Sequence, residues 1–533
     1  MDNQANFPPL GMTSEEFRRV GKELIDTIAD YYDNIEQLKP LSEVKPNYLR
    51  EIIPENAPEE PESFEVIKAD VDSKIRPGVT HFQSGNFFGY FPASSSYPGI
   101  LGDMYSSMFN GIGFSVTYTY LIYWINGPAM TELESITLDW LAKLIGLDDS
   151  YLFNRTDGKP STGGGVIQGS ASEAITVSLI AARKKATDKF KNANPGYSQL
   201  ELDTFLSKLI AIGSSQTHSS LEKATMIVGC KYKGITTGSD GSITKSLIET
   251  AVKECFDADL VPFFITGTFG TTAICAIDDF NGIADVTEEN DLWFHLDAAY
   301  AGAGLICEEL RELASGMNRS DSFNFNPHKW MLVNFDLSAL WFKNSYYVKS
   351  ALSIHRDYYK NNATDSGLVQ DYKDWQLPLG RRFRSLKLWF VLRTYGAKNI
   401  RSHIRKHIGF AKYLESNLRQ DSRFKVLYPV HFSLVVFYIS KESIAANFYP
   451  EIQNIDEIQN LDKLHTLVNS LLHKYILEKN EIFVTPTIVN NVSAIRVAIG
   501  APLTTKSNVD NVLNTVKNST DLIFAKKLSE LLE

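Results

Sequence analysis

The N-terminal region combines a periodic apolar pattern with a proline-rich stretch. Its apolar residues recur at helical spacing, at Phe17, Val20, Leu24, Ile28 and Tyr31. This pattern predicts a helix over residues 13–39, which Pro40 would end. Residues 40–63 hold five prolines and many acids, which indicates an extended arm. Because a helix and an arm have little core of their own, we expect residues 1–100 to pack against a neighbour, in the simplest case a second subunit.

Short apolar runs alternate with helical patterns through the middle of the chain. The runs expected to form buried strands are 225–229, 261–266, 292–296 and 339–342. The segment 131–134 matches a capping box at the start of an amphipathic helix. A glycine-rich run at 163–169 leads into an alanine-rich helix that ends near Arg183. Strands that alternate with helices predict an α/β fold, with a mostly parallel central sheet covered by helices on both faces.

The pattern changes at about Asp371. Helical spacing covers residues 389–408, and strand-like runs follow at 432–439, 482–484 and 494–498. These elements predict a smaller C-terminal domain of α+β type. The expected division is an N-terminal helical arm for dimerisation (1–100), a large domain (101–385) and a small domain (386–533).

Composition and charge exclude several classes of protein. The chain has 533 residues, and its 63 acids outnumber its 53 lysines and arginines, for a net charge of −10. An acidic surface argues against nucleic acid as a partner, since phosphate contacts need basic patches. The four cysteines form no Cys-x-x-Cys pair, and the first ten residues do not resemble a secretory signal. The uncharged stretch 104–131 is broken by glycine and proline, so we expect no membrane span. Because the cysteines suggest no disulfide framework and the start does not resemble a signal, we expect a cytoplasmic protein.

Two segments carry side chains that suit chemistry on a small ligand. The apolar run 292–296 ends in Asp297, and the carboxyl ends of strands border the ligand crevice in open α/β sheets. Lys329 lies among apolar neighbours, which lower the pKa of a lysine and free its amine for Schiff-base chemistry. A helix-capping acid and an ordinary surface lysine are the structural alternatives.

Two further features complete a recognisable set. Residues 169–172 open a helix with small and hydroxyl side chains, which suit a phosphate but are also ordinary helix caps. His218 follows an apolar run and can stack on a flat ring or move a proton. Together with the acid and the lysine, these features match what pyridoxal phosphate requires. The chain has no convincing Gly-x-Gly-x-x-Gly turn for hydride transfer, and the pair His403 and His407 lacks the intervening Glu of a zinc site, so we expect no metal.

Seven segments together resemble one enzyme family. They read EEFRRVGKELID, PGVTHFQSGNFFGYFP, GGGVIQGSASEA, FHLDAAYAG, SFNFNPHKW, DSGLVQDYKDWQLPLGRRFRSLK and AIRVAIG. The sequence resembles the aromatic-L-amino-acid decarboxylases, pyridoxal-phosphate group II decarboxylases of the aspartate-aminotransferase fold (fold type I). The resemblance runs from about Glu16 to beyond Ile499. It implies a homodimeric carboxy-lyase that converts aromatic L-amino acids to arylalkylamines and carbon dioxide, with pyridoxal 5′-phosphate as cofactor.

The resemblance also implies roles for individual positions. Lys329 would be the Schiff-base lysine, Asp297 would pair with the pyridine nitrogen, and Ala299 and His218 would pack on the two faces of the ring. The other positions expected to border the cofactor are Ser170, Ala171, Ser172, Thr268, Asn326 and His328. The substrate would contact Phe82, Tyr90, Phe91, Pro92, Phe114 and Gly380. Tyr358, with Tyr359 as the alternative in register, matches the loop tyrosine that protonates the substrate carbon.

The resemblance leaves the substrate and two alternative functions open. Tryptophan, 5-hydroxytryptophan, tyrosine, phenylalanine and DOPA are all candidates, and Gly380 leans towards tryptophan-like substrates. A bifunctional aromatic aldehyde synthase is one alternative, although such relatives tend to have Phe where Tyr358 stands. An inactive paralogue is the other, because Val116–Tyr123 is an insertion relative to the family pattern.

Overall fold

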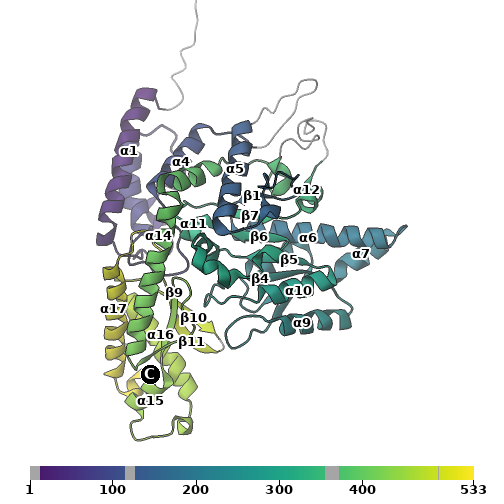
Figure 1. Ribbon diagram of the computed structural model, residues 1–533. Coiled ribbons are helices and arrows are strands. Elements are labelled where there is room, and N and C mark those ends of the chain that lie inside the picture. Colours follow the sequence, from purple (N-terminus) through teal and green to yellow (C-terminus); the bar gives the residue numbers. More distant parts are fainter. Residues whose placement is uncertain (1–11, 114–126, 355–370, 490, 533) are drawn as a thin grey trace, which may run out of the picture.

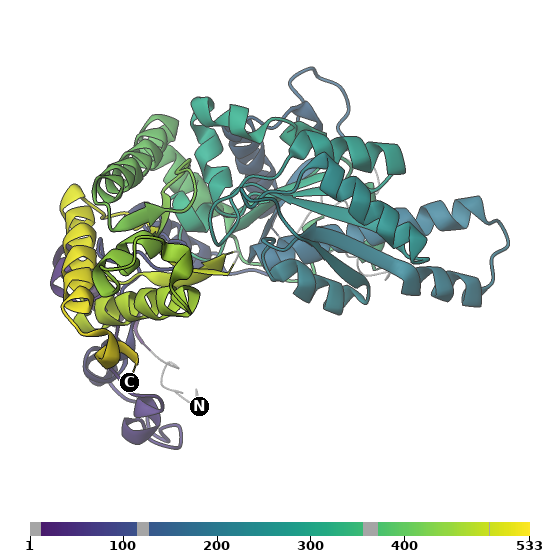
Figure 2. The same cartoon turned by 90° about the horizontal axis from the view of Figure 1, so that it is seen from below.

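Two β-sheets organise the described part of the chain, a seven-stranded sheet in its middle and a four-stranded sheet near its C-terminus. The computed structural model describes residues 12–113, 127–354, 371–489 and 491–532 (Figure 1). Figure 2 shows the teal strands and helices of the large sheet at one end of the molecule and the green and yellow small domain at the other. The predicted α/β class is confirmed.

The large sheet is parallel except at one strand. Its order is β1-β7-β6-β5-β4-β2-β3, and β7 runs antiparallel to both of its neighbours. The other neighbouring pairs are parallel. Most of the strands are buried along their whole length, which explains their continuous apolar runs. The strands are β1 (Gly164–Gln168), β2 (Leu209–Ser214), β3 (Lys231–Ile235), β4 (Val261–Thr268), β5 (Trp293–Asp297), β6 (Ser322–Phe325) and β7 (Ser338–Phe342).

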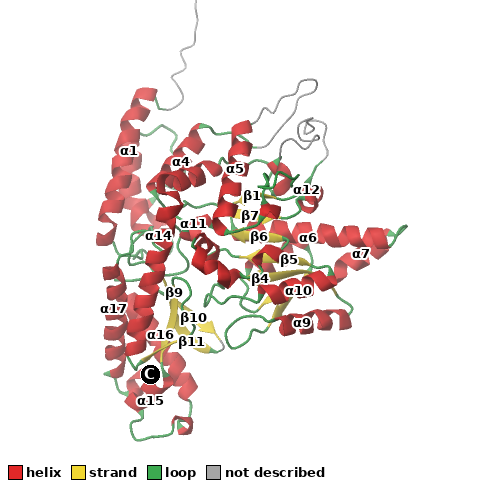
Figure 3. Cartoon of the chain, in the orientation of Figure 1, coloured by secondary structure: helices red, strands yellow, loops and turns green. Residues whose placement is uncertain are grey.

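Helices cover both faces of this sheet, as the alternating pattern predicts (Figure 3). One apolar core joins α6 and α8 to one face, and a second joins α5, α9 and α10 to the other. Successive residues of β2 and β7 fall alternately into the two cores, because side chains of a strand point to opposite faces. The helices of this region are α5 (Pro128–Ile145), α6 (Ala171–Ala193), α7 (Gln199–Lys208), α8 (Ser220–Val228), α9 (Lys245–Asp257), α10 (Phe280–Asn290), α11 (Pro327–Trp330) and α12 (Tyr346–Leu352).

Three predictions for this region are wrong. The run 225–229 is the end of α8, not a strand, and Gly229 caps the helix in the left-handed conformation. The capping box predicted at 131–134 lies inside α5, which begins three residues earlier at Pro128. Glu134 serves tertiary contacts instead of a cap, since its carboxylate accepts a hydrogen bond from Ile167 N at 2.8 Å. The helix predicted to end near Arg183 continues to Ala193.

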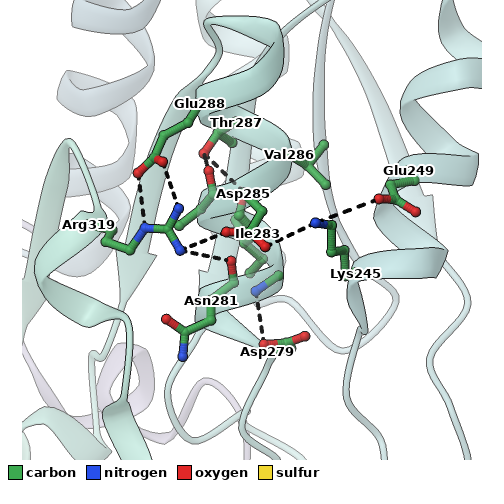
Figure 4. Close-up of polar contacts among 12 residues, drawn as sticks. Lys245, Glu249, Asp279, Asn281, Ile283, Asp285, Val286, Thr287, Glu288 and Arg319 are labelled. Carbon is green, nitrogen blue, oxygen red and sulfur yellow. Dashed lines mark hydrogen bonds and ion pairs between the residues drawn. The ribbon is translucent and has the colours of Figure 1, made fainter.

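Charged side chains tie α9 and α10 together on the surface (Figure 4). The Arg319 guanidinium donates to Asp285 at 2.8 Å and to Glu288 at 2.6 Å. Lys245 of α9 reaches the other oxygen of Asp285 at 3.0 Å. Exposed ion pairs of this kind contribute about 0.2–1 kcal/mol each to stability. This network therefore supports the fold and has no part in the candidate site.

The N-terminal arm is helical and lies along the small domain. It contains α1 (Ser14–Asn34), a 3-10 turn (Ile35–Gln37), α2 (Tyr48–Ile52), α3 (Phe64–Asp70) and α4 (Tyr97–Met108). The expected extended stretch thus includes one short helix, α2. In Figure 1 the purple α1 and the yellow α17 (Lys506–Phe524) lie along the same side of the molecule. Glu36 joins the two parts by accepting a hydrogen bond from Asn508 Nδ2 at 3.0 Å.

The small domain is an antiparallel sheet with helices, as predicted. Its strand order is β10-β11-β9-β8. The predicted strand 482–484 is wrong: Phe483 makes only an isolated bridge to Phe87, and the strand begins at Thr485. The strands and remaining helices are α14 (Ser385–Gln420), β8 (Phe424–Val426), β9 (Leu434–Ile439), α15 (Lys441–Phe448), α16 (Leu461–Lys479), β10 (Thr485–Val489), β11 (Val492–Ala498) and α18 (Leu528–Leu532). Among the described residues, no helix combines the length and the apolar character needed to cross a membrane.

Candidate active site

Strands β4, β5 and β6 end beside one another at the carboxyl edge of the large sheet. Thr268 of β4 lies opposite Asp297 of β5, which lies opposite Asn324 of β6. Just beyond β6 the chain turns into α11, which carries Lys329. Residues from separate segments therefore meet where open α/β sheets bind their ligands.

Lys329 is held in an environment that favours a neutral amine. Burial lowers the pKa of Lys329, and the nearby Arg496 lowers it further, while Asp297 acts in the opposite direction. The Lys329 Nζ lies 5.4 Å from the centroid of the Phe91 ring. A neutral amine is the form that attacks a carbonyl carbon, so this environment suits covalent catalysis.

The N-terminal arm supports the backbone on both sides of Lys329. Ser94 N donates to the carbonyl of His328 at 2.8 Å, and Ser94 Oγ donates to the carbonyl of Lys329 at 2.6 Å. Ser96 Oγ donates to the carbonyl of Leu332 at 2.7 Å. The end of the arm is thus part of the structure that positions the lysine.

The Asp297 carboxylate is fixed at the end of β5. The side chain belongs to a residue only 4% exposed. Its Oδ1 accepts from Ala299 N at 2.9 Å and from Asn324 Nδ2 at 3.4 Å. Both hydrogen bonds use the same oxygen, which leaves Oδ2 to meet a further donor or a positive charge.

His218 lies in the turn after β2, and its tautomer follows from its hydrogen bonds. Ser220 N donates to His218 Nδ1 at 3.2 Å, and Ser220 Oγ lies 2.9 Å from the same nitrogen. Since Nδ1 accepts, the proton of the neutral ring is on Nε2. Partial burial lowers the pKa of His218, while Asp297 raises it and Lys329 lowers it.

The start of α6 provides backbone N–H groups and hydroxyls just beyond the end of β1. Ser170 caps the helix by accepting from Glu173 N at 3.2 Å, and Ala171 and Ser172 form its first turn. A Cβ added to Gly169 would lie 2.9 Å from side-chain oxygens of Asp336 and Glu173, so a larger residue here would displace these two side chains. Such a helix start favours an anion.

His328 and Asn326 lie close to Lys329 in the sequence, and each offers a polar atom at the site. Burial lowers the pKa of His328 to about 3, and its Nδ1 accepts from Leu337 N at 2.9 Å. The neutral ring therefore carries its proton on Nε2. Asn326 Oδ1 and Thr268 Oγ1 are buried and have no hydrogen-bond partner among the described residues. Buried polar atoms are rarely left unpaired, so these two indicate a polar ligand at the site.

These residues fit pyridoxal phosphate. Lys329 could hold its aldehyde, Asp297 could face its ring nitrogen, and the start of α6 could bind its phosphate. Thr268 and Asn326 offer polar atoms that the cofactor's own polar groups could satisfy. The fit rests on the kind and the placement of the side chains.

The predicted aromatic wall falls into two groups. The Phe91 ring lies beside the amine of Lys329. Pro92 packs closely against Gly500, since a Cβ added to Gly500 would lie 2.3 Å from the Pro92 ring. Phe82 and Tyr90 belong to a second group, in which Phe82 lies 4.3 Å from Phe87 and Tyr90 5.8 Å from Phe483, between ring centroids. Tyr90 is exposed and has a positive φ of 55°.

Gly380 lies beside a different segment of the chain. A Cβ added to it would lie 3.6 Å from the carbonyl oxygen of Ile112, to which Arg381 N donates at 2.9 Å. Arg381 is itself fixed by a buried pair with both oxygens of Glu134, at 2.6 and 2.8 Å. Phe114, Tyr358, Tyr359 and the insertion Val116–Tyr123 lie outside the described residues.

Sequence reasoning missed one charged residue at the site. Arg496 of β11 is buried, and its Cζ lies 5.2 Å from the centroid of the Phe91 ring. Its Nε donates to Ala273 O and its Nη1 to Thr485 Oγ1, both at 3.1 Å. The signal for it was an arginine inside the apolar strand-like run 494–498, since buried arginines need a reason.

Comparison with known proteins agrees with this geometry. The model of the pyridoxal-dependent decarboxylase conserved domain matches residues 46–440. The aromatic-L-amino-acid decarboxylase of Bos taurus is 43% identical over 466 residues, 87% of this chain and 92% of that protein. The phenylacetaldehyde synthase of Petunia hybrida is 41% identical over 515 residues, 96% of this chain and 95% of that protein. A crystal structure of Oryza sativa TDC with PLP and tryptamine has a TM-score of 0.88 at 34% identity, and the match covers 97% of this chain and 100% of that chain. The chain belongs to the pyridoxal-dependent decarboxylases and, within them, to the aromatic-L-amino-acid decarboxylase family.

Proposed function

We propose that the chain converts aromatic L-amino acids to arylalkylamines and carbon dioxide at the site around Lys329 and Asp297. This proposal rests on one observation: Lys329, a lysine of lowered pKa just after β6, lies at the same sheet edge as the buried carboxylate of Asp297 at the end of β5. Family membership supports the reaction class. The relative crystallised with tryptamine supports an aromatic amine as product.

Each side chain has a defined task in this proposal. Pyridoxal phosphate, when bound, supplies an electron sink for the electron pair that departing carbon dioxide leaves on the α-carbon. Lys329 would hold the aldehyde carbon of the cofactor, and the charge of Asp297 would keep the ring nitrogen protonated. His218 and Ala299 would enclose the ring, and Ala171, Ser172, Asn326 and His328 would hold the phosphate. Tyr358 gives a proton to the α-carbon in place of the lost carboxylate.

The test is a panel of tryptophan, 5-hydroxytryptophan, tyrosine, phenylalanine and DOPA, with amine, carbon dioxide and hydrogen peroxide measured together. Amine and carbon dioxide in equal amounts, without peroxide, would support the proposal. Peroxide and aldehyde formed in step with carbon dioxide would assign the activity of the Petunia hybrida relative instead. Cofactor-loaded protein that acts on none of the five would overturn the proposal in favour of an inactive paralogue.

Replacing Tyr358 with Phe should divert product from amine to aldehyde. Without the phenol, proton delivery to the α-carbon slows, and oxygen competes for the same electron pair. The measurement is the ratio of aldehyde to amine at saturating substrate. Tyr359→Phe is the matched control and should keep the wild-type ratio, while the opposite outcome would move the role to Tyr359.

We also propose that the enzyme is a homodimer joined through the N-terminal arm. Phe17 of α1 is 67% exposed, Met108 of α4 is 64% exposed and Phe109 is 55% exposed. Exposed large apolar side chains of this kind are candidates for burial in a subunit interface. Light scattering should give twice the chain mass of 59.8 kDa.

The double variant Phe17→Glu/Met108→Glu should shift the dimer towards monomer, because it introduces charge into the apolar contact. Leu200→Glu on α7, which is also exposed, is the control and should remain dimeric. A monomeric wild-type protein would contradict the dimer.

A cytoplasmic location is part of the same proposal. All four cysteines are free, and three of them are buried. Unpaired thiols are typical of reducing compartments.

A further inference from the structure

Three aromatic rings form a stack that begins at the candidate site and leads into the core. Phe91 and Tyr300 lie 3.7 Å apart between centroids with planes 12° apart, and Tyr300 and Trp330 lie 5.0 Å apart with planes 17° apart. We call Phe91, Tyr300 and Trp330 the ring stack. Its members come from the arm, from the turn after β5 and from α11, so the stack joins separate segments around Lys329.

The first ring of the stack faces the reactive groups. The Lys329 Nζ lies 5.4 Å and the Arg496 Cζ 5.2 Å from the centroid of Phe91. Tyr300 is fully buried and supports Phe91 from behind. Any displacement of Tyr300 would therefore move the aromatic surface next to the lysine.

The last ring is fixed by a histidine of a distant helix. Trp330 Nε1 donates to His407 Nδ1 at 3.0 Å, and both residues are fully buried. His407 belongs to α14, and burial lowers its pKa well below the ordinary value, which keeps it a neutral acceptor. The half-buried His403, with its ring centroid 4.3 Å away, and Lys406 lower the pKa of His407 further.

We propose that His407 is a positioning residue for decarboxylation, acting through the ring stack on Phe91 and through α11 on Lys329. It touches none of the reacting atoms. Trp330 directly follows Lys329 in the one-turn helix α11, so the indole that His407 holds also sets the backbone of the lysine. Because the stack ends at the predicted substrate wall, His407 further affects the choice between indole and phenyl substrates. This inference rests on the proposed function.

The matched variants are His407→Leu, His407→Asn, Trp330→Phe and the double variant Trp330→Phe/His407→Leu. His407→Leu leaves the indole N–H buried without an acceptor, and we expect kcat/KM to fall roughly 10- to 100-fold, as small misplacements do. His407→Asn should restore most of the activity, because its side-chain oxygen can take the place of Nδ1. The double variant removes donor and acceptor together and should be less impaired than His407→Leu alone.

The readout that separates positioning from stability is the ratio of kcat/KM for tryptophan to that for tyrosine. A loss of folded protein lowers both values equally and leaves the ratio unchanged. We expect His407→Leu to change the ratio and the visible circular dichroism of bound pyridoxal phosphate, and His407→Asn to restore both. The thermal midpoint of the cofactor-free variants shows separately how far the fold is weakened.

Two results would overturn the inference while the proposed function stands. One is a His407→Leu variant with wild-type kinetics and ratio, and the other is the same loss in His407→Leu and His407→Asn. If His407→Leu does not fold, Trp330→Phe carries the test, and a wild-type ratio in this variant would equally overturn the inference. A wild-type enzyme that produces no amine would overturn the proposed function itself.

Discussion

Lys329→Ala should abolish amine formation, with a loss of at least about a thousandfold in kcat, as expected when a covalent catalytic group is removed. Burial lowers the pKa of this lysine, so that the wild-type amine is available to bond with the cofactor aldehyde. The variant lacks this amine and any means of holding the cofactor covalently. Amine release is the first measurement. Borohydride reduction followed by mass spectrometry of the peptide that contains residue 329 is the second, and only wild type should carry the cofactor mass.

Two further lysine variants make this result specific. Lys329→Arg places a fixed positive charge at this position but cannot form the covalent link, so it should be as inactive as the alanine variant. Lys343→Ala is the control, because burial lowers the pKa of Lys343 as well while its amine donates to the carbonyl of Asn318, away from the site. It should keep the wild-type kcat. Amine formation by Lys329→Ala would contradict the proposed role.

Asp297→Asn should lower kcat by about 10²–10³-fold, the usual effect of removing one group that stabilises charge in the transition state. The substitution keeps the shape of the side chain, and an amide oxygen can still accept from Ala299 N. What is lost is the negative charge that would hold a proton on the ring nitrogen. Steady-state rates at saturating cofactor separate this effect from weaker cofactor binding.

The control for Asp297 is Asp321, a half-buried acid on the same strand pair. Asp321 precedes β6, and its carboxylate accepts from Phe294 N of β5 at 2.8 Å. Burial raises the pKa of Asp321. Asp321→Asn should lower the thermal midpoint and leave kcat unchanged. Equal losses of kcat in the two variants would mean that Asp297 acts through the sheet and not on the cofactor.

The large sheet and the positions of Asp297 and Lys329 could be predicted because they follow from local pattern. Most of the strands are apolar runs bounded by polar residues, and parallel strands bring their carboxyl ends to one edge, whereas β3 (KYKGI) shows no such run. The run 225–229 was misleading because it is too short to separate strand from helix. Buried Leu221, Ala224 and Val228 show the helical spacing only when the window is widened.

Other features depend on packing between segments that spacing does not connect. The antiparallel direction of β7 leaves no mark in its composition, since it is as buried as its neighbours. The local sequence around Glu134 predicted a helix cap, but the side chain pairs with Arg381, which is 247 residues away in the sequence. Arg496 and the ring stack likewise come from the arm, the middle and the end of the chain, and they become visible only when these segments are folded together.

The hydrogen bonds from Ser94 and Ser96 to the backbone around Lys329 affect how hybrids of related enzymes would behave. An exchange of the first hundred residues between two homologues would look like a swap of a peripheral oligomerisation module. It would in fact replace the serines that hold the backbone around the reactive lysine, together with the ring of Phe91. Hybrids that take the arm and α11 from the same homologue should therefore keep turnover, and hybrids that take them from different homologues should lose it.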